Sequence, residues 1–250
     1  MAGHSHWAGI KHKKAVVDAR RGKLFSKLSK GIMSAARQGG GDPETNLKLK
    51  YAIDKAKAGN MTRDAIERAV KKGTGELGAE NFEELSYEGY APGGIAIMVE
   101  ALTDNRNRTA PEIKKLLERR GGQLGAPGCV AYLFTKQAIF HVPQSAMGED
   151  ELMEIVLEAG ADNLESMGDI FVISGEPSDF NAIQDALSQR EIPLELAEIQ
   201  QVPATTVEVA DPEMAKKILK LMEELDDHDD VQNVSSNFDI PEAILETLED

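Results

Sequence analysis

Cysteine is almost absent from this 250-residue chain, which holds only one, Cys129. A single cysteine excludes an internal disulfide and a zinc site built on several cysteine ligands. The sequence also lacks an uninterrupted apolar run of about 18 residues, so we expect no membrane-spanning helix. The basic N-terminus has no apolar core of the kind that marks a secretory signal. Together these absences favour a reducing, cytoplasmic compartment.

Sequence motifs of catalysis are missing as well. No Gly-x-Ser-x-Gly or His-Glu-x-x-His occurs, and Cys129 has no evident histidine partner. The glycines at 39–41 follow no predicted strand, so we interpret them as a helix stop rather than a phosphate-binding loop. His4, His6 and His12 have no cysteine or carboxylate beside them to complete a metal site. We therefore expect no enzyme, no small-molecule substrate, no cofactor and no bound metal.

Positive charge is scarce overall but concentrated at one end. The net charge is −15, yet residues 1–73 carry 17 Lys and Arg against 6 Asp and Glu, or +11. Residues 74–250 carry 11 against 37, or −26. Such asymmetry indicates a polyanion-binding region joined to acidic domains that nucleic acid would repel. The alternative interpretation is a basic bundle that docks on its acidic neighbours.

The first fourteen residues have no helical period, and we expect them to form a flexible basic arm. Trp7 lies among its cations, and its ring either stacks on a base or anchors the arm beneath the helices. A helix predicted from about Ala15 to Gln38 continues the positive charge. The candidate nucleic-acid-binding residues are His6, Trp7, Lys11, His12, Lys13, Lys14, Arg20, Arg21, Lys23, Lys27 and Lys30.

Two further helices are predicted, from about Pro43 to Ala58 and from about Thr62 to Lys72, each followed by glycine. Apolar residues recur at spacings of three and four in all three helices. Short turns between three helices predict a small bundle, which also allows a helix-turn-helix interpretation.

After a glycine-rich linker, the period of the apolar residues changes to two, which predicts strands. Residues 136–201 predict the order β-α-β-β-α-β, which is ferredoxin-like. The flanking predictions are strands at Gly94–Leu102, Cys129–Phe134, Thr205–Val209 and Val231–Phe238, and helices at Pro111–Arg120, Pro212–Leu225 and Pro241–Leu248. We expect an α+β multidomain fold: a three-helix bundle plus two ferredoxin-like α/β domains, one inserted in the other. The expected domains are 1–77, 80–134 together with 204–250, and the inserted 135–203.

The loop at 104–108 is the one unusual segment outside the basic region. Its candidate RNA or partner contacts are Asn105, Arg106, Asn107 and Arg108. The favoured interpretation is a capped turn whose arginines pair with nearby carboxylates, with Thr109 as the N-cap of the next helix. The run Asp226–Asp230 lacks the spacing of a calcium loop, so we interpret it as a solvated acidic turn.

Several segments of the chain resemble one known family. They are MAGHSHWAGIKHKKA, AARQGGGDPETN, AIDKAKAGNM, IERAVKKGTGE, YEGYAPGGIAIMVEALTDNRNRTAPEIK and GGQLGAPGCVAYLF, with a looser match over residues 207–243. The resemblance is to the YebC/PmpR family of probable transcriptional regulatory proteins, related to the mitochondrial translational activator of cytochrome c oxidase subunit I. The chain departs from the family pattern at His6, where lysine is usual, and at Leu47, where proline is usual.

The resemblance implies a helical domain followed by two α/β domains, and a cytoplasmic role in gene expression rather than catalysis. Our first hypothesis is a DNA-binding transcriptional regulator. The alternatives are a ribosome- or RNA-binding translation factor that relieves stalling on difficult sequences such as proline runs, and an acidic protein-interaction scaffold. The charge pattern favours a nucleic-acid partner and does not choose between promoter DNA and ribosomal RNA.

Overall fold

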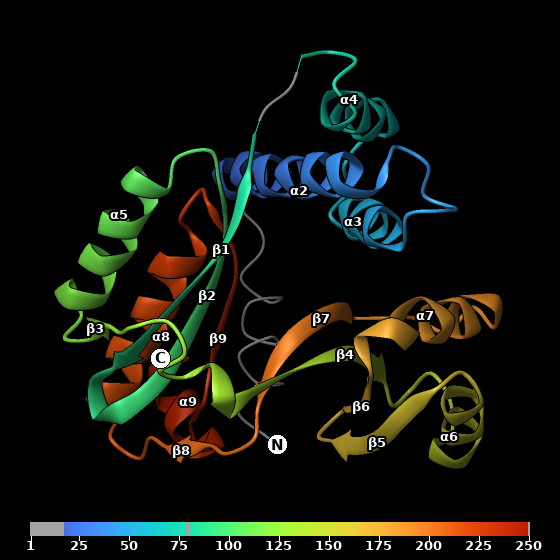
Figure 1. The fold of residues 1–250 in the computed structure, drawn as a ribbon. Coiled ribbons are helices and arrows are strands. Elements are labelled where there is room, and N and C mark those ends of the chain that lie inside the picture. Colours follow the sequence, from blue (N-terminus) through green and yellow to red (C-terminus); the bar gives the residue numbers. More distant parts are fainter. Residues whose placement is uncertain (1–17, 79–80, 250) are drawn as a thin grey trace. The chain divides into compact units, whose positions relative to one another are not determined.

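The computed structural model describes residues 18–78 and 81–249 of the chain (Figure 1). The chain forms two compact units. Among the described residues, one unit contains those up to Leu133 together with those from Pro203 onward, and the other is Phe134–Val202. Within the described ranges, none of the helices has the length and apolar character needed to span a bilayer.

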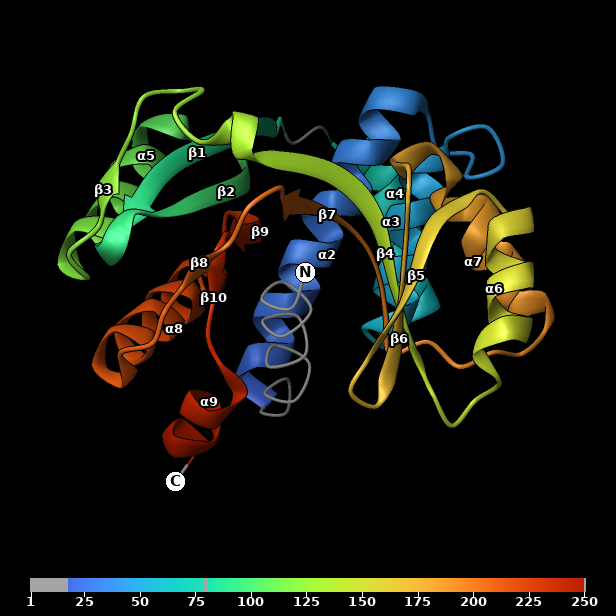
Figure 2. The same ribbon diagram turned by 90° about the horizontal axis from the view of Figure 1, so that it is seen from below.

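Three helices form the N-terminal part of the first unit: α2 (Asp18–Gly39), α3 (Leu47–Ala58) and α4 (Arg63–Gly73). The longest, α2, packs against both others (Figures 1 and 2). Their shared core contains Ile32, Leu49 and Ile66. Each of these helices buries one apolar stripe that it could not bury alone. The predicted three-helix bundle is therefore confirmed.

The helix α3 begins at Leu47 rather than near Pro43, because Asn46 caps it. The side-chain oxygen of Asn46 accepts a hydrogen bond from the backbone N–H of Leu49 at 3.1 Å. Its amide nitrogen donates to the carbonyls of Ala35 at 2.9 Å and Gly40 at 2.8 Å. One buried amide thus joins the end of α2 to the start of α3.

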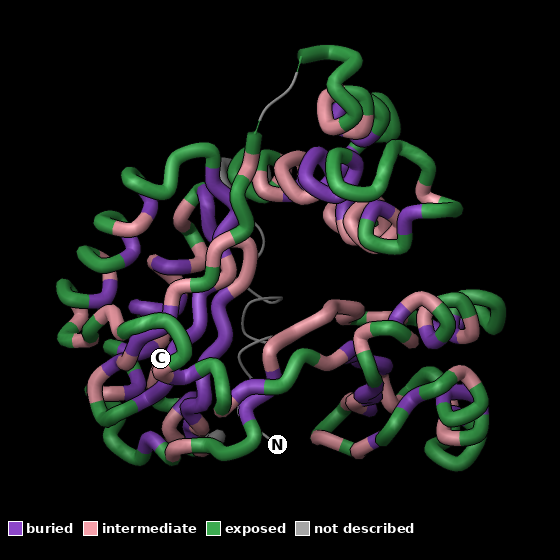
Figure 3. The backbone as a smooth tube through the Cα atoms, viewed as in Figure 1, coloured by how far each residue is buried: buried purple, intermediate pink, exposed green. Residues whose placement is uncertain are grey.

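The rest of the first unit is built on a four-stranded sheet with the order β3-β1-β2-β9. The strands are β1 (Glu83–Ala91), β2 (Ile95–Thr103), β3 (Gln123–Leu124) and β9 (Val231–Ser236), with the short turn η1 (Pro92–Gly94) between the first two. Helices α5 (Arg106–Arg119) and α8 (Pro212–Asp226) contact the sheet and each other. Figure 3 shows the buried residues that follow β2 and β9.

Two predicted strands are absent from this sheet. The segment predicted as a strand at Cys129–Phe134 contains one turn of 3₁₀ helix, η2 (Ala131–Leu133). The second predicted strand, Thr205–Val209, contains β8 (Val207–Glu208), which pairs in parallel with β10 (Phe238–Asp239) and not with the four-stranded sheet. The helix α9 (Glu242–Glu249) follows β10 in the chain.

The carboxylate of Glu88 in β1 explains the first of these errors. It accepts hydrogen bonds from the backbone N–H groups of Gly128 at 2.6 Å and of Val130 and Ala131 at 2.8 Å each. These amides are therefore not available to a strand ladder. The segment folds around a buried anion instead, which the apolar pattern of its residues did not reveal.

The second unit forms a separate four-stranded sheet with the order β5-β6-β4-β7. Its elements are β4 (Phe134–Pro143), α6 (Glu149–Glu158), β5 (Ala161–Met167), β6 (Ile170–Gly175), η3 (Pro177–Asp179), α7 (Phe180–Gln189) and β7 (Leu196–Pro203). This is the ferredoxin-like arrangement, as predicted. The rings of Phe140 and Phe180 stack in its core with their centroids 4.9 Å apart.

The sheet of the first unit has the same layout in a different chain order. Strands β2, β3, β1 and β9 occupy the places that β4, β5, β6 and β7 occupy in the second unit. The place of β6, the third strand of the second unit in chain order, is therefore filled by β1. This strand precedes β2 in the chain and pairs with it antiparallel. Helices α5 and α8 then correspond to α6 and α7. Both α/β sheets are thus ferredoxin-like in strand order.

Candidate nucleic-acid interface

Six of the predicted contact residues lie outside the described residues. They are His6, Trp7, Lys11, His12, Lys13 and Lys14. Arg20 and Arg21 belong to the first turn of α2. The role of these eight residues in binding stays a prediction.

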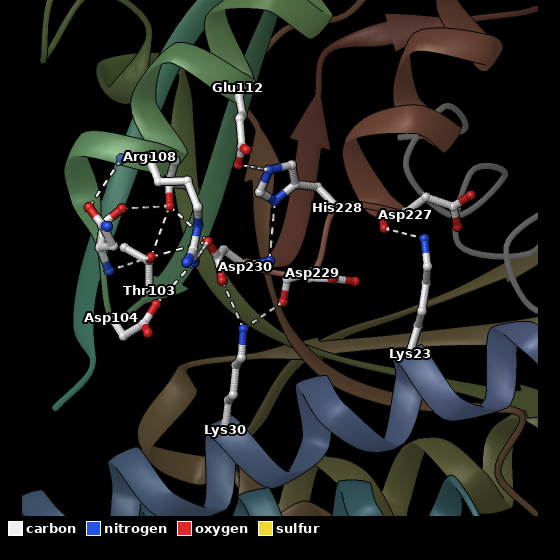
Figure 4. A network of polar contacts seen from close by, with 12 residues as sticks. Lys23, Lys30, Thr103, Asp104, Arg108, Glu112, Asp227, His228, Asp229 and Asp230 are labelled. Atoms are coloured by element: carbon white, nitrogen blue, oxygen red, sulfur yellow. Dashed lines mark hydrogen bonds and ion pairs between the residues drawn. The ribbon is translucent and has the colours of Figure 1, made fainter. Parts of the chain in front are cut away.

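The other three predicted contacts, Lys23, Lys27 and Lys30, are spaced by four and three and so lie on one face of α2. This face meets the segment Asp226–Asp230, which we call the acidic turn (Figure 4). The Nζ atoms of Lys23, Lys27 and Lys30 donate to the carbonyl oxygens of Asp227 at 3.2 Å, of Asp226, and of Asp229 at 3.1 Å, respectively. The alternative of a basic helix that docks on its acidic neighbours therefore describes Lys23, Lys27 and Lys30, which we call the lysine stripe.

The electrostatics of a helix end explain these contacts. The carbonyls of Asp226, the last residue of α8, and of Asp227, its C-cap, lie at the negative end of the helix dipole. A cation placed there contributes about 0.3–1 kcal/mol at an exposed position. Lys23 and Lys27 thus act as a C-terminal cap for α8, while Lys30 contacts the turn that follows it.

Asp230 is the buried centre of the contact, with a side chain that is 2% exposed. Its Oδ1 accepts a hydrogen bond from Nζ of Lys30 at 2.8 Å. Its Oδ2 accepts from Nη2 of Arg108 at 2.7 Å and from the hydroxyls of Thr109 at 2.8 Å and Thr103 at 3.1 Å. The expectation of a solvated turn is therefore wrong for Asp230, because donors from three separate segments surround its carboxylate.

These donors also decide the charge of Asp230. Burial alone would raise the pKa of its carboxyl group, but hydrogen bonds from Lys30, Arg108 and Thr109 hold that pKa well below its usual range. Asp230 is consequently an anion near neutral pH. The backbone carbonyl of Asp230 also accepts from the N–H of Leu102 at 2.7 Å, which ties the acidic turn to β2.

The capped turn predicted at 104–108 is present. Asn105 is the N-cap of α5, and its side chain accepts from the backbone N–H of Arg108 at 3.2 Å. The guanidinium of Arg108 pairs with Asp104 at 3.0 Å and with Asp230 at 2.7 Å. Thr109, which was predicted to be the cap, lies buried inside α5 because Asn105 starts the helix four residues earlier.

Among the four candidate contacts of this loop, the side chains of Asn105 and Arg108 already make contacts within the protein, as the helix cap and in the ion pairs. Arg106 and Asn107 are exposed on the first turn of α5. They are the two that remain accessible to an RNA or protein partner.

A second joint connects the bundle to the sheet at Glu84. Its Oε1 accepts hydrogen bonds from Lys48 at 2.6 Å and from Ser34 and Gln38 at 3.1 Å each. Burial would raise the pKa of Glu84, yet the charge of Lys48 and these hydrogen bonds lower it. The exposed cation Lys48 therefore belongs to this joint.

Two further exposed cations on α4, Arg68 and Lys71, were not among the predicted contacts. The side chains of Arg68 and Lys71 are exposed and have no partner among the described residues. Arg63, on the same helix, pairs with Glu67 at 2.8 Å. The spacing of three between Arg68 and Lys71 places both on one face of the helix, and this spacing can be read from the sequence.

In the part of the chain that the structure describes, no group of three or more His, Cys, Asp or Glu could hold a metal ion.

Two family descriptions match this chain, and together they cover the residues of the contact between α2 and the acidic turn. The description "TACO1/YebC protein N-terminal domain" matches residues 5–76, and "TACO1/YebC second and third domain" matches residues 82–238. A protein of Natranaerobius thermophilus named "Probable transcriptional regulatory protein" is 52% identical over 99% of this chain and 100% of its own length. Proteins of the same name from Halothermothrix orenii and Aquifex aeolicus are 53% and 50% identical, over 99% of this chain and 99% and 100% of their own lengths.

A solved structure is also similar. The crystal structure of a conserved hypothetical protein from Aquifex aeolicus matches with a TM-score of 0.84 and 49% sequence identity. The match covers 95% of this chain and 98% of that one.

Proposed function

Because the chain belongs to the TACO1/YebC family, we propose that it is a nucleic-acid-binding regulator of gene expression that binds duplex DNA. The regulatory role is the one that its relatives' names state. The observation that carries nucleic-acid binding is the charge of +11 on residues 1–73 beside −26 on the rest. A basic segment of this kind attracts phosphates, whereas the acidic remainder repels them.

We assign the phosphate contacts to the basic segment that precedes the lysine stripe. Its cations are Lys11, Lys13, Lys14, Arg20 and Arg21. Each contact with a phosphate releases condensed counterions, so the logarithm of affinity falls with the logarithm of salt by about 0.9 per contact. Binding should therefore weaken steeply as salt rises.

A quadruple charge reversal tests this assignment. The variant Lys13→Glu, Lys14→Glu, Arg20→Glu and Arg21→Glu should lose binding to a labelled DNA duplex in fluorescence anisotropy. The matched control reverses four exposed lysines of α5 and α8: Lys115→Glu, Lys216→Glu, Lys217→Glu and Lys220→Glu. It changes the net charge equally and should retain most of the binding. Equal losses in both variants would mean that net charge, and not this segment, determines affinity.

A second candidate function is a translation factor that binds ribosomal RNA. The observation that favours it is Trp7 among the histidines and lysines of the first fourteen residues. An aromatic ring among cations suits unpaired bases, which RNA loops present and duplex DNA does not. Competition between the duplex and a single-stranded RNA of equal length distinguishes the two. Tighter RNA binding that is lost with Trp7→Ala would favour translation over transcription.

A further inference from the structure

Each lysine of the stripe on α2 already donates to an oxygen of the acidic turn. Lys30 contacts both the Asp229 carbonyl and the Asp230 carboxylate, and its side chain is only 17% exposed. Lys23 and Lys27 contact the carbonyls at the end of α8. These oxygens are the same kind of acceptor that a phosphate backbone offers to an ammonium group.

The length of the stripe also fits a nucleic-acid strand. Lys23 and Lys30 are seven residues apart, which corresponds to about 10 Å along a helix. Phosphates of one strand repeat about every 3.4 Å along a duplex axis. Three ammonium groups over this length can therefore follow a short run of phosphates. They cannot contact those phosphates and the acidic turn at the same time.

We infer that the acidic turn is an internal competitor of nucleic acid, which occupies Lys23, Lys27 and Lys30 until a phosphate backbone displaces it. This inference rests on the proposed function and describes how that function is restrained. The turn is the fixed partner, because Arg108 of α5 and the backbone N–H of Leu102 in β2 hold Asp230 in place. The stripe on α2 is the side that is released.

The consequence is selectivity between weak and strong polyanion partners. A partner that offers only scattered negative charge cannot replace the ordered oxygens of the acidic turn. A partner that first binds the basic segment preceding the stripe gains three further contacts once the turn is displaced. Affinity should then rise more steeply with the number of phosphates than in a protein with a free stripe.

Linking the two sides chemically tests this inference. In a Cys129→Ser background, Ser26→Cys on α2 and Asp227→Cys on the turn are joined by a short bis-maleimide. Both positions are exposed, and Lys23 contacts the Asp227 carbonyl rather than its side chain. The linked protein should bind a labelled duplex at least tenfold more weakly than the same unlinked protein. Its salt slope should be shallower by up to about 2.7, since three contacts are lost.

Neutralising the turn tests the opposite direction. The variant Asp226→Asn, Asp227→Asn and Asp229→Asn keeps the carbonyls but removes three charges, so it should bind the duplex several-fold more tightly. The control Glu83→Gln, Glu208→Gln and Glu213→Gln changes the net charge equally at exposed positions of the same unit. Its affinity should rise less, because none of its carboxylates belongs to the acidic turn.

The outcomes separate the inference from the proposed function. If linked and unlinked proteins bind with the same affinity and salt slope, the acidic turn is no competitor, while nucleic-acid binding stands. If the two neutralised variants gain affinity equally, the inference fails in the same way. If no version of the protein binds duplex DNA or single-stranded RNA, the proposed function and the inference both fail.

Discussion

At the scale of single residues, Asp230 does the most to join distant parts of the first unit. Its carboxylate accepts from Lys30 of α2, Arg108 of α5 and Thr103 at the end of β2. A buried carboxylate with this many donors is costly to remove, because its neighbours keep their polar groups when it is gone. The residue thus contributes to stability and to the position of the lysine stripe together.

Replacing Asp230 with alanine should lower the free energy of unfolding by about 1–3 kcal/mol. The buried hydroxyls of Thr103 and Thr109 lose their anionic acceptor, whereas Arg108, 44% exposed, reaches water. Urea denaturation measures the difference. Asp229→Ala is the matched control, because this neighbouring side chain is exposed and should cost no more than about 0.5 kcal/mol. Equal costs for both variants would contradict the assignment of Asp230 as the centre of the contact.

The ion pairs of Glu224 with Arg119 and Arg120 make the stability of the protein depend on pH. Hydrogen bonds from Arg120 and then Arg119 lower the pKa of Glu224 from 4.5 to about 2. Since the folded pKa is the lower one, this contribution is complete above about pH 4.5 and is lost as the pH falls toward about 2.

The measurement is the melting temperature across this acidic range. Glu224→Gln should melt lower than the native chain at pH 6, and the gap should narrow toward pH 2. The exposed Glu208→Gln serves as the control and should follow the native curve. A gap that stays constant with pH would show that the charge of Glu224 does not matter.

At the scale of elements, close packing of α4 on α2 depends on a glycine. A Cβ at Gly73 would lie 2.5 Å from the backbone oxygen of Met33 and 2.8 Å from the Cβ of Ala36. The sequence suggested that Gly73 was only a helix stop, but it is the last residue of α4 and allows the two helices to touch. By contrast, a Cβ at Gly22 of α2 would meet nothing within 4 Å among the described residues.

These two glycines give opposite predictions for the same substitution. Gly73→Ala should destabilise the protein by about 1–3 kcal/mol, because a backbone must shift to admit the methyl group. Gly22→Ala should stabilise it by about 0.5–1 kcal/mol, because alanine loses less backbone entropy in a helix. Thermal and urea denaturation of both variants measure the signs. A stabilising Gly73→Ala would contradict the close contact between α2 and α4.

At the scale of the whole molecule, the chain leaves and re-enters the first unit at one place. The carbonyl of Leu133 accepts a hydrogen bond from the N–H of Ala204 at 2.8 Å. The segment Phe134–Val202 has its own sheet and its own core. We propose that the chain consists of three domains, with this segment as the inserted one.

Removing the insertion tests that proposal. Replacing residues 134–202 with a short Gly-Ser linker should leave a protein that unfolds cooperatively, because insertions between adjacent chain ends are tolerated. The shortened protein should also keep its affinity for the duplex, since the proposed contacts lie in the basic segment. A control that replaces α8 and β9 with the same linker should not fold. Non-cooperative melting of the first variant would contradict an independent insertion.

Local patterns in the sequence determined the helices of the bundle, the ferredoxin-like order of 136–201 and the uneven distribution of charge. Their physical basis is short-range: the periods of apolar residues and the sum of charges depend only on neighbours in the chain. The tertiary structure alone decided where β1 enters its sheet and why residues 125–131 form no strand, because Glu88 lies some 40 residues away. It also decided the partners of Lys23, Lys27 and Lys30. Whether a lysine contacts a phosphate or an internal carbonyl depends on which distant segment folds against it, and the sequence pattern is the same in both cases.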